Sequence, residues 1–209
     1  MPTTQRPGLT RLVIEQSALD LVNRVGLNAL TMRLLAKELD VQSPALYWHF
    51  RNKDELLKGM AEQIYIAGGM GAPGADEPWE EWLMRRSLSY RAALNKYRDG
   101  ARIAAAATDG SETLMGLFDE EITAMVGYGF SPSLALHTVS VITHYISGFV
   151  LKEQGAAGDL DALQLPANIS DTLRDAFQQG GSPLSFEIFV HGIRMIVAGV
   201  RAELLETGA

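Results

Sequence analysis

The chain contains no cysteine. Disulfide bonds and thiolate metal sites are therefore excluded, and the composition is compatible with a reducing compartment. The sequence also lacks an uninterrupted run approaching the roughly 18 apolar residues that a membrane-crossing helix needs. Its opening stretch, MPTTQRPGLTR, lacks the apolar region of a signal peptide. We therefore expect a cytoplasmic protein with no membrane partner.

Sequence patterns of catalysis and metal binding are also missing. The four histidines, His49, His137, His144 and His191, show no HExxH or related spacing, and GxSxG does not occur. The glycine-rich segment 68–78 lacks GK[ST] and follows no strand pattern, so a loop is a better interpretation than a phosphate cradle. We expect no enzyme, no metal site and no cofactor.

Charge is unevenly distributed along the chain. Hydrophobic residues make up 47% and charged residues 21%, which predicts a packed core. The net charge of −7 argues against a nucleic-acid partner for the chain as a whole. Residues 1–67, however, hold 8 Lys or Arg against 7 Asp or Glu, whereas residues 68–209 hold 10 against 18. The acidity belongs to the second part, and DNA binding by the first part would depend on a few well-placed cations.

Helical periodicity and capping residues predict four helices in residues 10–67. The first runs from about Thr10 to Gly26. Thr31 is a good N-cap for a second helix ending near Asp40, and Ser43-Pro44 predicts a capping hydroxyl followed by a proline at the first position of a short third helix. A fourth helix spans 52–67. Two short helices joined by a tight turn are typical of a helix-turn-helix.

The short third helix has two different sides. Leu46 and Phe50, four residues apart, can bury one side, which leaves polar and small side chains on the others. The YWHF run fits either a connector with aromatic core residues or a surface that reads DNA. Cations on both sides of the run favour DNA. The candidate DNA-binding residues are Thr31, Arg33, Ser43, Pro44, Ala45, Tyr47, His49 and Lys53.

The segment GGMGAPGADEP marks the clearest boundary, and it predicts two domains, 1–67 and 68–209. Further helices are expected from Trp79 to near Asp99, then over 111–127, 132–154, 171–178 and 184–205. The segment RIAAAATDGSE remains ambiguous between helix and turn. The acidic run 119–121 is most simply a solvated helix face.

The helices over 132–154 and 184–205 carry more apolar surface than one neighbour covers. They fit either burial inside a monomer or a dimer interface of four helices, two from each subunit, and we prefer the dimer. The residues expected at that interface are Val139, Ile142, Phe189, Ile193 and Val197.

The segments GLNALTMRLLAKELDV and PALYWHFRNKDELL resemble the DNA-binding domain of the tetracycline repressor family over residues 11–67. Three later segments resemble the regulatory domain of tetracycline repressors proper: WEEWLMRRSLSYRAALNKYRDGARI, GYGFSPSLALHTVSVITHYISGFVLKEQ and FEIFVHGIRMIVAGVRAEL. The resemblance implies an all-α fold, with a three-helix DNA-binding domain joined by a linking helix to a larger ligand-binding and dimerisation domain. It also implies a homodimeric repressor that binds a palindromic operator and is released by a small molecule. A sequestering protein with a vestigial DNA reader is the alternative.

Departures from the family concern the drug site. At the positions where tetracycline repressors hold a magnesium-chelated drug, this chain has Gly69, Arg86, Tyr90, Ala104 or Ala105, the run 107–110 and Lys152. Losing an imidazole and a carboxylate removes the metal's protein ligands, so the resemblance implies an effector other than magnesium-tetracycline.

The effector is expected to be largely apolar, and the residues proposed to contact it fit either a ligand cavity or plain core. Arg86 fits either an anion contact or a solvated helix face. Asp99 and Gly100 match the family's segment that relays ligand binding to the linking helix. The candidate ligand-binding residues are Arg86, Tyr90, Ile103, Leu114, Leu117, Ile122, His144 and Tyr145.

Overall fold

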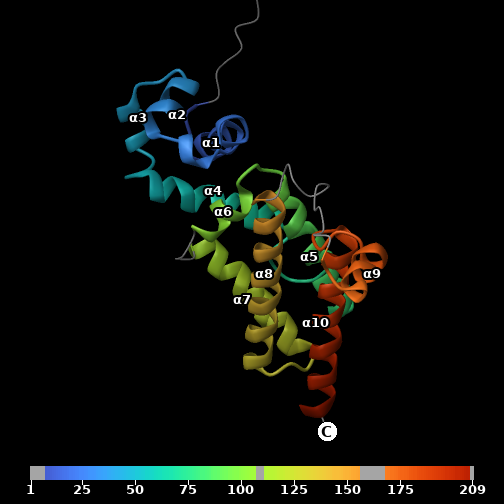
Figure 1. Cartoon of the computed structure of the whole chain (residues 1–209). Helices are drawn as coiled ribbons and strands as arrows, with labels where there is room; N and C mark the ends of the chain where they lie inside the picture. Colours follow the sequence, from blue (N-terminus) through green and yellow to red (C-terminus); the bar gives the residue numbers. More distant parts are fainter. Residues whose placement is uncertain (1–7, 107–110, 156–167, 208–209) are drawn as a thin grey trace, which may run out of the picture. The chain divides into compact units, whose positions relative to one another are not determined.

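The computed structural model describes residues 8–106, 111–155 and 168–207, and within these ranges the chain is helical with no strand (Figure 1). The predicted all-α fold is confirmed. The helices are α1 (Arg11–Val25), the 3₁₀ turn η1 (Leu27–Ala29), α2 (Met32–Glu38), α3 (Ser43–Tyr47), α4 (Lys53–Ala67), α5 (Trp79–Asn95), α6 (Gly100–Ala105), α7 (Glu112–Gly127), α8 (Pro132–Gly155), α9 (Asp171–Gly180) and α10 (Phe186–Thr207).

Side-chain caps set several helix starts. The oxygens of Thr10, Thr31, Asn52 and Ser170 each accept a hydrogen bond from the amide three residues ahead, at 3.3, 3.1, 2.8 and 3.2 Å. Each bond satisfies one amide that the helix itself leaves without a partner. At the other end of α1, Gly26 has φ 81° and stops the helix as predicted.

The start of α3 differs from the prediction. Ser43 is the first helical residue rather than its cap, and the cap is Gln42, which makes no side-chain capping bond. Pro44 therefore lies at the second helical position, where its missing amide hydrogen costs nothing. With five residues and no side-chain cap, α3 depends on its surroundings for stability.

The turn between α2 and α3 is a tight chain reversal. Helix α2 ends at Glu38, two residues before the predicted end at Asp40. Asp40 has φ 55°, a left-handed conformation that aspartate tolerates better than most residues. The amide of Val41 donates to the Ala36 carbonyl at 3.0 Å, and that of Asp40 donates to the Lys37 carbonyl at 3.2 Å. This Schellman pattern of hydrogen bonds fixes where α3 begins.

The chain divides into two compact units. One comprises Met1–Gly71 with Ser89–Asp119, and the other comprises Ala72–Leu88 with Glu120–Ala209. Helices α5 and α7 each run from one unit into the other, so α6 belongs to the same unit as α1–α4. The division into domains at residue 67 stays a prediction.

In the first unit, α1 and α4 pack through an apolar core that contains one carboxyl group. Glu15 is only 6% exposed and accepts a hydrogen bond from Gln63 Nε2 at 3.1 Å. It lies against Gly59, where a Cβ would come within 2.3 Å of Glu15 Oε1. Burial raises the pKa of Glu15 despite the nearby Arg11. Gly59 therefore allows α1 and α4 to approach closely.

In the second unit, α8 packs against α10 through aromatic rings. Tyr145 stacks on Phe189 with ring centroids 5.8 Å apart, and its hydroxyl donates to the Phe189 carbonyl at 3.2 Å. The ring lies over Gly192, where a Cβ would collide with the hydroxyl at 2.1 Å. By length and composition alone, α8 could cross a membrane, although core helices of other proteins pass the same test.

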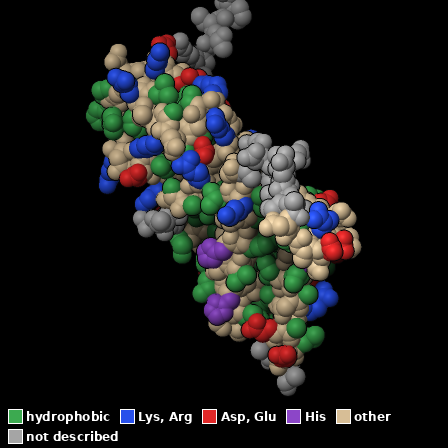
Figure 2. Space-filling view, in the orientation of Figure 1, with side chains coloured by type: hydrophobic (Ala, Val, Ile, Leu, Met, Phe, Trp, Pro, Cys, Tyr) green, Lys and Arg blue, Asp and Glu red, His purple; other side chains and the backbone are tan. Residues whose placement is uncertain are grey.

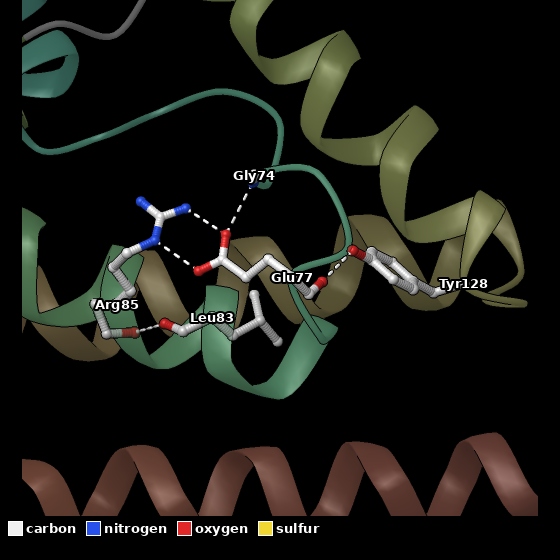
Figure 3. A network of polar contacts seen from close by, with 6 residues as sticks. Gly74, Glu77, Leu83, Arg85 and Tyr128 are labelled. Atoms are coloured by element: carbon white, nitrogen blue, oxygen red, sulfur yellow. Dashed lines mark hydrogen bonds and ion pairs between the residues drawn. The ribbon is translucent and has the colours of Figure 1, made fainter.

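Hydrogen bonds of Glu77 hold the loop before α5 in place (Figure 3). Its carboxylate accepts bonds from Arg85 Nε and Nη2, both at 2.7 Å, and from the Gly74 amide at 2.9 Å. The Tyr128 hydroxyl, at the end of α7, donates to the Glu77 carbonyl. Together these bonds hold the loop between the first turns of α5 and the end of α7.

The Glu77 network predicts an acid-resistant carboxylate. Arg85 is the main cause that lowers the pKa of Glu77 from 4.5 to about 2, followed by the Gly74 amide. A depressed folded-state pKa means that the contribution to stability is present above pH 4.5 and is lost as the pH falls toward 2. Carbon-detected NMR titration should therefore place the Glu77 midpoint near 2. In Arg85→Ala the midpoint should return toward 4.5, and an unchanged midpoint would contradict the assignment.

Candidate functional site

Helix α3 presents aromatic side chains to solvent while its other side is buried. Leu46 and Phe50 are fully buried, as their spacing predicts. Tyr47 is 51% exposed, and Trp48 directly after the helix is 88% exposed. Two adjacent large aromatic rings exposed in this way are unusual on a protein surface, so Tyr47 and Trp48 form a candidate binding surface. Of the two interpretations of the YWHF run, the structure therefore excludes a purely internal connector.

The other candidate DNA contacts lie around α3 in the same unit. Arg33 and Pro44 are exposed, and Ser43, Ala45, His49 and Lys53 are partly exposed. Thr31 is exposed as well, although its hydroxyl already accepts the capping bond of α2. Figure 2 shows Lys and Arg side chains spread over the surface of α1–α4. Cations spread in this way can bind phosphates on both sides of a groove.

Trp48 is the surface residue that sequence reasoning missed. The helical spacing indicates its exposure, because position 48 lies two residues from each of the buried positions Leu46 and Phe50 and so points away from both. An indole ring can stack on a sugar or a base edge, and its Nε1 can donate to a phosphate. Trp48 therefore belongs with Tyr47 in the candidate surface.

A second polar cluster joins the start of α6 to the end of α1. Asp99 precedes α6 but makes no side-chain cap for it. Instead Oδ2 accepts the Leu27 amide at 2.7 Å, and Oδ1 pairs with Arg102 at 2.9 Å. Arg102 also donates to Asn28 Oδ1 at 2.8 Å. Burial alone would raise the pKa of Asp99, but these hydrogen bonds and the nearby arginines lower it below its ordinary value.

Gly100 is required at the start of α6 by a close approach of two backbones. A Cβ at this position would lie 2.0 Å from the Leu94 carbonyl oxygen. Next to it, the Arg98 amide donates to Asn23 Oδ1 on α1 at 2.8 Å. The two predicted relay residues, Asp99 and Gly100, therefore lie where α6 is tied to α1 and η1. The structure shows the contacts, and signalling through them is a proposal.

The predicted ligand contacts belong to both units. Tyr90 is buried and stacks on Tyr65 of α4 with centroids 5.2 Å apart. Gly68 lies against the same ring, since a Cβ there would meet Tyr90 at 2.8 Å. In the first unit, Ile103 and Leu114 are also buried, and Leu117 is half-buried. In the second unit, Ile122 and Tyr145 are half-buried, and His144 is exposed. The run 107–110 lies outside the described residues.

Burial rules out the solvated-face interpretation for both Arg86 and Glu121. The Arg86 guanidinium pairs with Glu121 through Nε to Oε1 and through Nη2 to Oε2, the latter at 2.9 Å. The side chains are 4% and 0% exposed, so neither belongs to a solvated helix face. Burying two charges costs several kcal/mol unless both are paired and hydrogen-bonded, and this two-point geometry supplies both conditions. The guanidinium thus already has a carboxylate partner.

The residues predicted for a dimer interface are mostly core residues of the subunit. Val139, Ile142, Phe189 and Ile193 are buried within the chain, and Val197 is half-buried. The apolar spacing predicted the helices correctly, but the residues predicted for the interface lie mostly on the face that packs inside the subunit. The large apolar side chains that α8 and α10 leave exposed are Leu136, Val141, Leu151, Phe186, Met195 and Leu205.

Comparison with known proteins relates both parts of the chain to one family. Residues 14–60 match "Bacterial regulatory proteins, tetR family", and residues 71–204 match "Tetracyclin repressor-like, C-terminal domain". The chain is 40% identical over 194 residues to the tetracycline repressor protein class A from transposon 1721 of Escherichia coli. The aligned region covers 88% of this chain and 87% of that protein.

Two solved structures agree with this relationship. A TetR variant from Acinetobacter baumannii AYE in complex with minocycline is 35% identical, with a TM-score of 0.79 over 93% of this chain and 94% of that one. The class A TetR in complex with 5a,6-anhydrotetracycline and magnesium is 34% identical, with a TM-score of 0.70 over 93% and 99% of the two chains. The chain therefore belongs to the tetracycline repressor (TetR) family and is a ligand-responsive, DNA-binding transcriptional regulator rather than an enzyme.

Proposed function

We propose that this protein is a cytoplasmic repressor that binds a palindromic operator as a homodimer and is released by a small molecule other than magnesium-tetracycline. The single observation that carries the proposal is the outward presentation of Tyr47 and Trp48 by a helix whose opposite side, Leu46 and Phe50, is fully buried. Such a helix can enter the major groove while its own unit holds it in place. The palindrome follows from twofold symmetry, which repeats the same surface on each half-site.

Dimerisation is supported by the surface of the second unit. Helices α8 and α10 pack together through Tyr145 and Phe189, yet both keep large apolar side chains exposed. On α10, Met195 is 62% exposed and Leu205 is 71% exposed. Two helices from each subunit can bury such faces as a four-helix bundle. We propose that the exposed apolar residues of α8 and α10 form the interface in place of the buried ones.

The relay is supported by the Asp99 cluster. Asp99 and Arg102 bond to Leu27 and Asn28 of η1, which lies between α1 and α2. A displacement of α6 would therefore move η1 as well. An effector that binds one position of α6 more tightly than another would then change the orientation of the DNA reader. Only this difference in affinity between the two positions can release the operator.

The nature of the effector is constrained by the residues that replace the drug contacts. Lys152 and Gly69 stand where the resemblance implies a carboxylate and an imidazole for the magnesium ion. The Arg86 guanidinium is neutralised by Glu121, so it offers no unbalanced charge to a ligand anion. Hard cations prefer oxygen ligands, and a lysine in place of a carboxylate repels them. An effector that needs no metal agrees better with these residues.

The first prediction from the proposed function concerns Tyr47. Tyr47→Ala should weaken specific binding to a DNA duplex selected from a random library by at least about tenfold, since one good base contact contributes roughly 1–3 kcal/mol. The side chain is half exposed, so the melting temperature and the dimer mass by size exclusion should not change. Tyr47→Phe, as the matched variant, separates loss of the hydroxyl from loss of the ring. Unchanged affinity in Tyr47→Ala would sink the assignment.

The second prediction concerns magnesium and tetracycline. Titration of the protein into the magnesium–tetracycline chelate, followed by drug fluorescence, should give no saturation in the micromolar range. The class A repressor provides the positive control under the same conditions. Micromolar binding to this protein would show that the missing imidazole and carboxylate are replaced by other ligands, and it would remove the basis for a different effector.

The third prediction concerns Asp99. Asp99→Ala removes the acceptor of the Leu27 amide, so hydrogen exchange at Leu27 should accelerate and the first unit should lose roughly 1–3 kcal/mol of stability. Asp99→Asn keeps an oxygen acceptor and should protect the Leu27 amide better than Asp99→Ala. If operator affinity is the same in wild type and Asp99→Ala although exchange accelerates, the cluster holds the fold without relaying a signal.

A further inference from the structure

The segment that follows α3 is bonded to α1 through a backbone carbonyl. His49, two residues beyond the helix, carries its carbonyl next to the aromatic residues of the DNA-reading surface. This carbonyl accepts a hydrogen bond from Arg11 Nη1, from the first residue of α1.

The same guanidinium makes two further contacts. Its Cζ lies 4.2 Å from the centroid of the Phe50 ring, which is a cation–π geometry. Its Nη1 also pairs with Glu55 Oε1 of α4 at 2.9 Å. One side chain therefore bonds the segment that follows α3, covers the ring that anchors it, and ties both to α4.

Glu55 is itself held in place. Its Oε2 accepts the Arg51 amide at 2.7 Å, and its own amide donates to Asn52 Oδ1 at 2.8 Å. The Arg51 amide and then Arg11 lower the pKa of Glu55, so the carboxylate is ionised at neutral pH. Arg11 thus bonds a fixed charge on one side and the backbone of the reading segment on the other.

Building on the proposed operator binding, we propose that Arg11 is a positioning residue for DNA reading, which sets the orientation of residues 47–49 through the His49 carbonyl, the Phe50 ring and Glu55. A surface ion pair alone would not support this role, because half-exposed pairs contribute little to stability. The support comes from the convergence of three contacts on the short segment that carries Tyr47 and His49. Both hydrogen bonds come from Nη1 while Cζ covers the ring. A lysine would end at the position of Cζ, so it could not cover the ring and also place a donor where Nη1 lies.

The test compares Arg11→Ala and Arg11→Lys with a matched control, Arg24→Ala. Arg24 lies on the same helix, has a similar exposure and pairs with Glu38 at 2.7 Å, so its loss removes the same charge from the same unit. Binding to the selected duplex and to a scrambled duplex is measured at several salt concentrations, together with the melting temperature and the dimer mass.

If Arg11 positions α3, both Arg11 variants should lose about tenfold or more in specific affinity, with little change on scrambled DNA, as expected for one charge-assisted hydrogen bond. Arg24→Ala should keep the ratio of specific to scrambled binding. In a double-mutant cycle, Glu55→Gln should weaken specific binding by itself and add little to Arg11→Ala, because both changes break the same connection.

Two results would overturn the proposal. If Arg11→Lys restores affinity, and Arg11→Ala weakens specific and scrambled binding equally with a salt slope reduced by about 1, Arg11 contacts a phosphate directly. If specific affinity is unchanged in Arg11→Ala, the cluster only stabilises the fold. Failure of the wild type to select any duplex would instead count against the proposed repressor function.

Discussion

The fold of the DNA-reading unit depends on the burial of Leu46 and Phe50. A helix of five residues has too few internal hydrogen bonds to persist alone, so its stability comes from these two side chains. Their burial determines which way the intervening residues point, and it places Tyr47 and Trp48 in solvent. The left-handed Asp40 in the preceding turn fixes where the helix starts, and Arg11 bonds the segment after it. The proposed DNA-reading surface therefore depends on contacts made away from that surface.

Within this unit, α6 is connected to η1 and the end of α1 by hydrogen bonds and not by apolar packing alone. Asp99 directs its carboxylate to Leu27 instead of capping its own helix. The α6 N-terminus gives up a local bond and gains one to another segment. Gly100 permits this geometry because any Cβ would collide with the Leu94 carbonyl.

The interior of the second unit contains charged and polar groups among its apolar side chains. Arg86 and Glu121 form a buried ion pair, and such a pair is seldom more stabilising than apolar residues of the same volume. Within the described part of the chain, Trp82 Nε1 and Thr138 Oγ1 are also buried without a hydrogen-bond partner. Buried polar groups of this kind commonly have a role other than stability.

The sequence by itself determined the order and approximate ends of the helices, because caps such as Thr31 and Asn52 and stops such as Gly26 act locally. It also identified the buried side of α3, since the spacing of Leu46 and Phe50 suffices. Only the tertiary structure decided that Glu121 is internal, that Val139 and Ile142 face their own core, and that Arg11 bonds His49. Helical spacing shows which residues share a face but not which neighbour covers that face. Burial and long-range pairing depend on segments that are distant in the sequence.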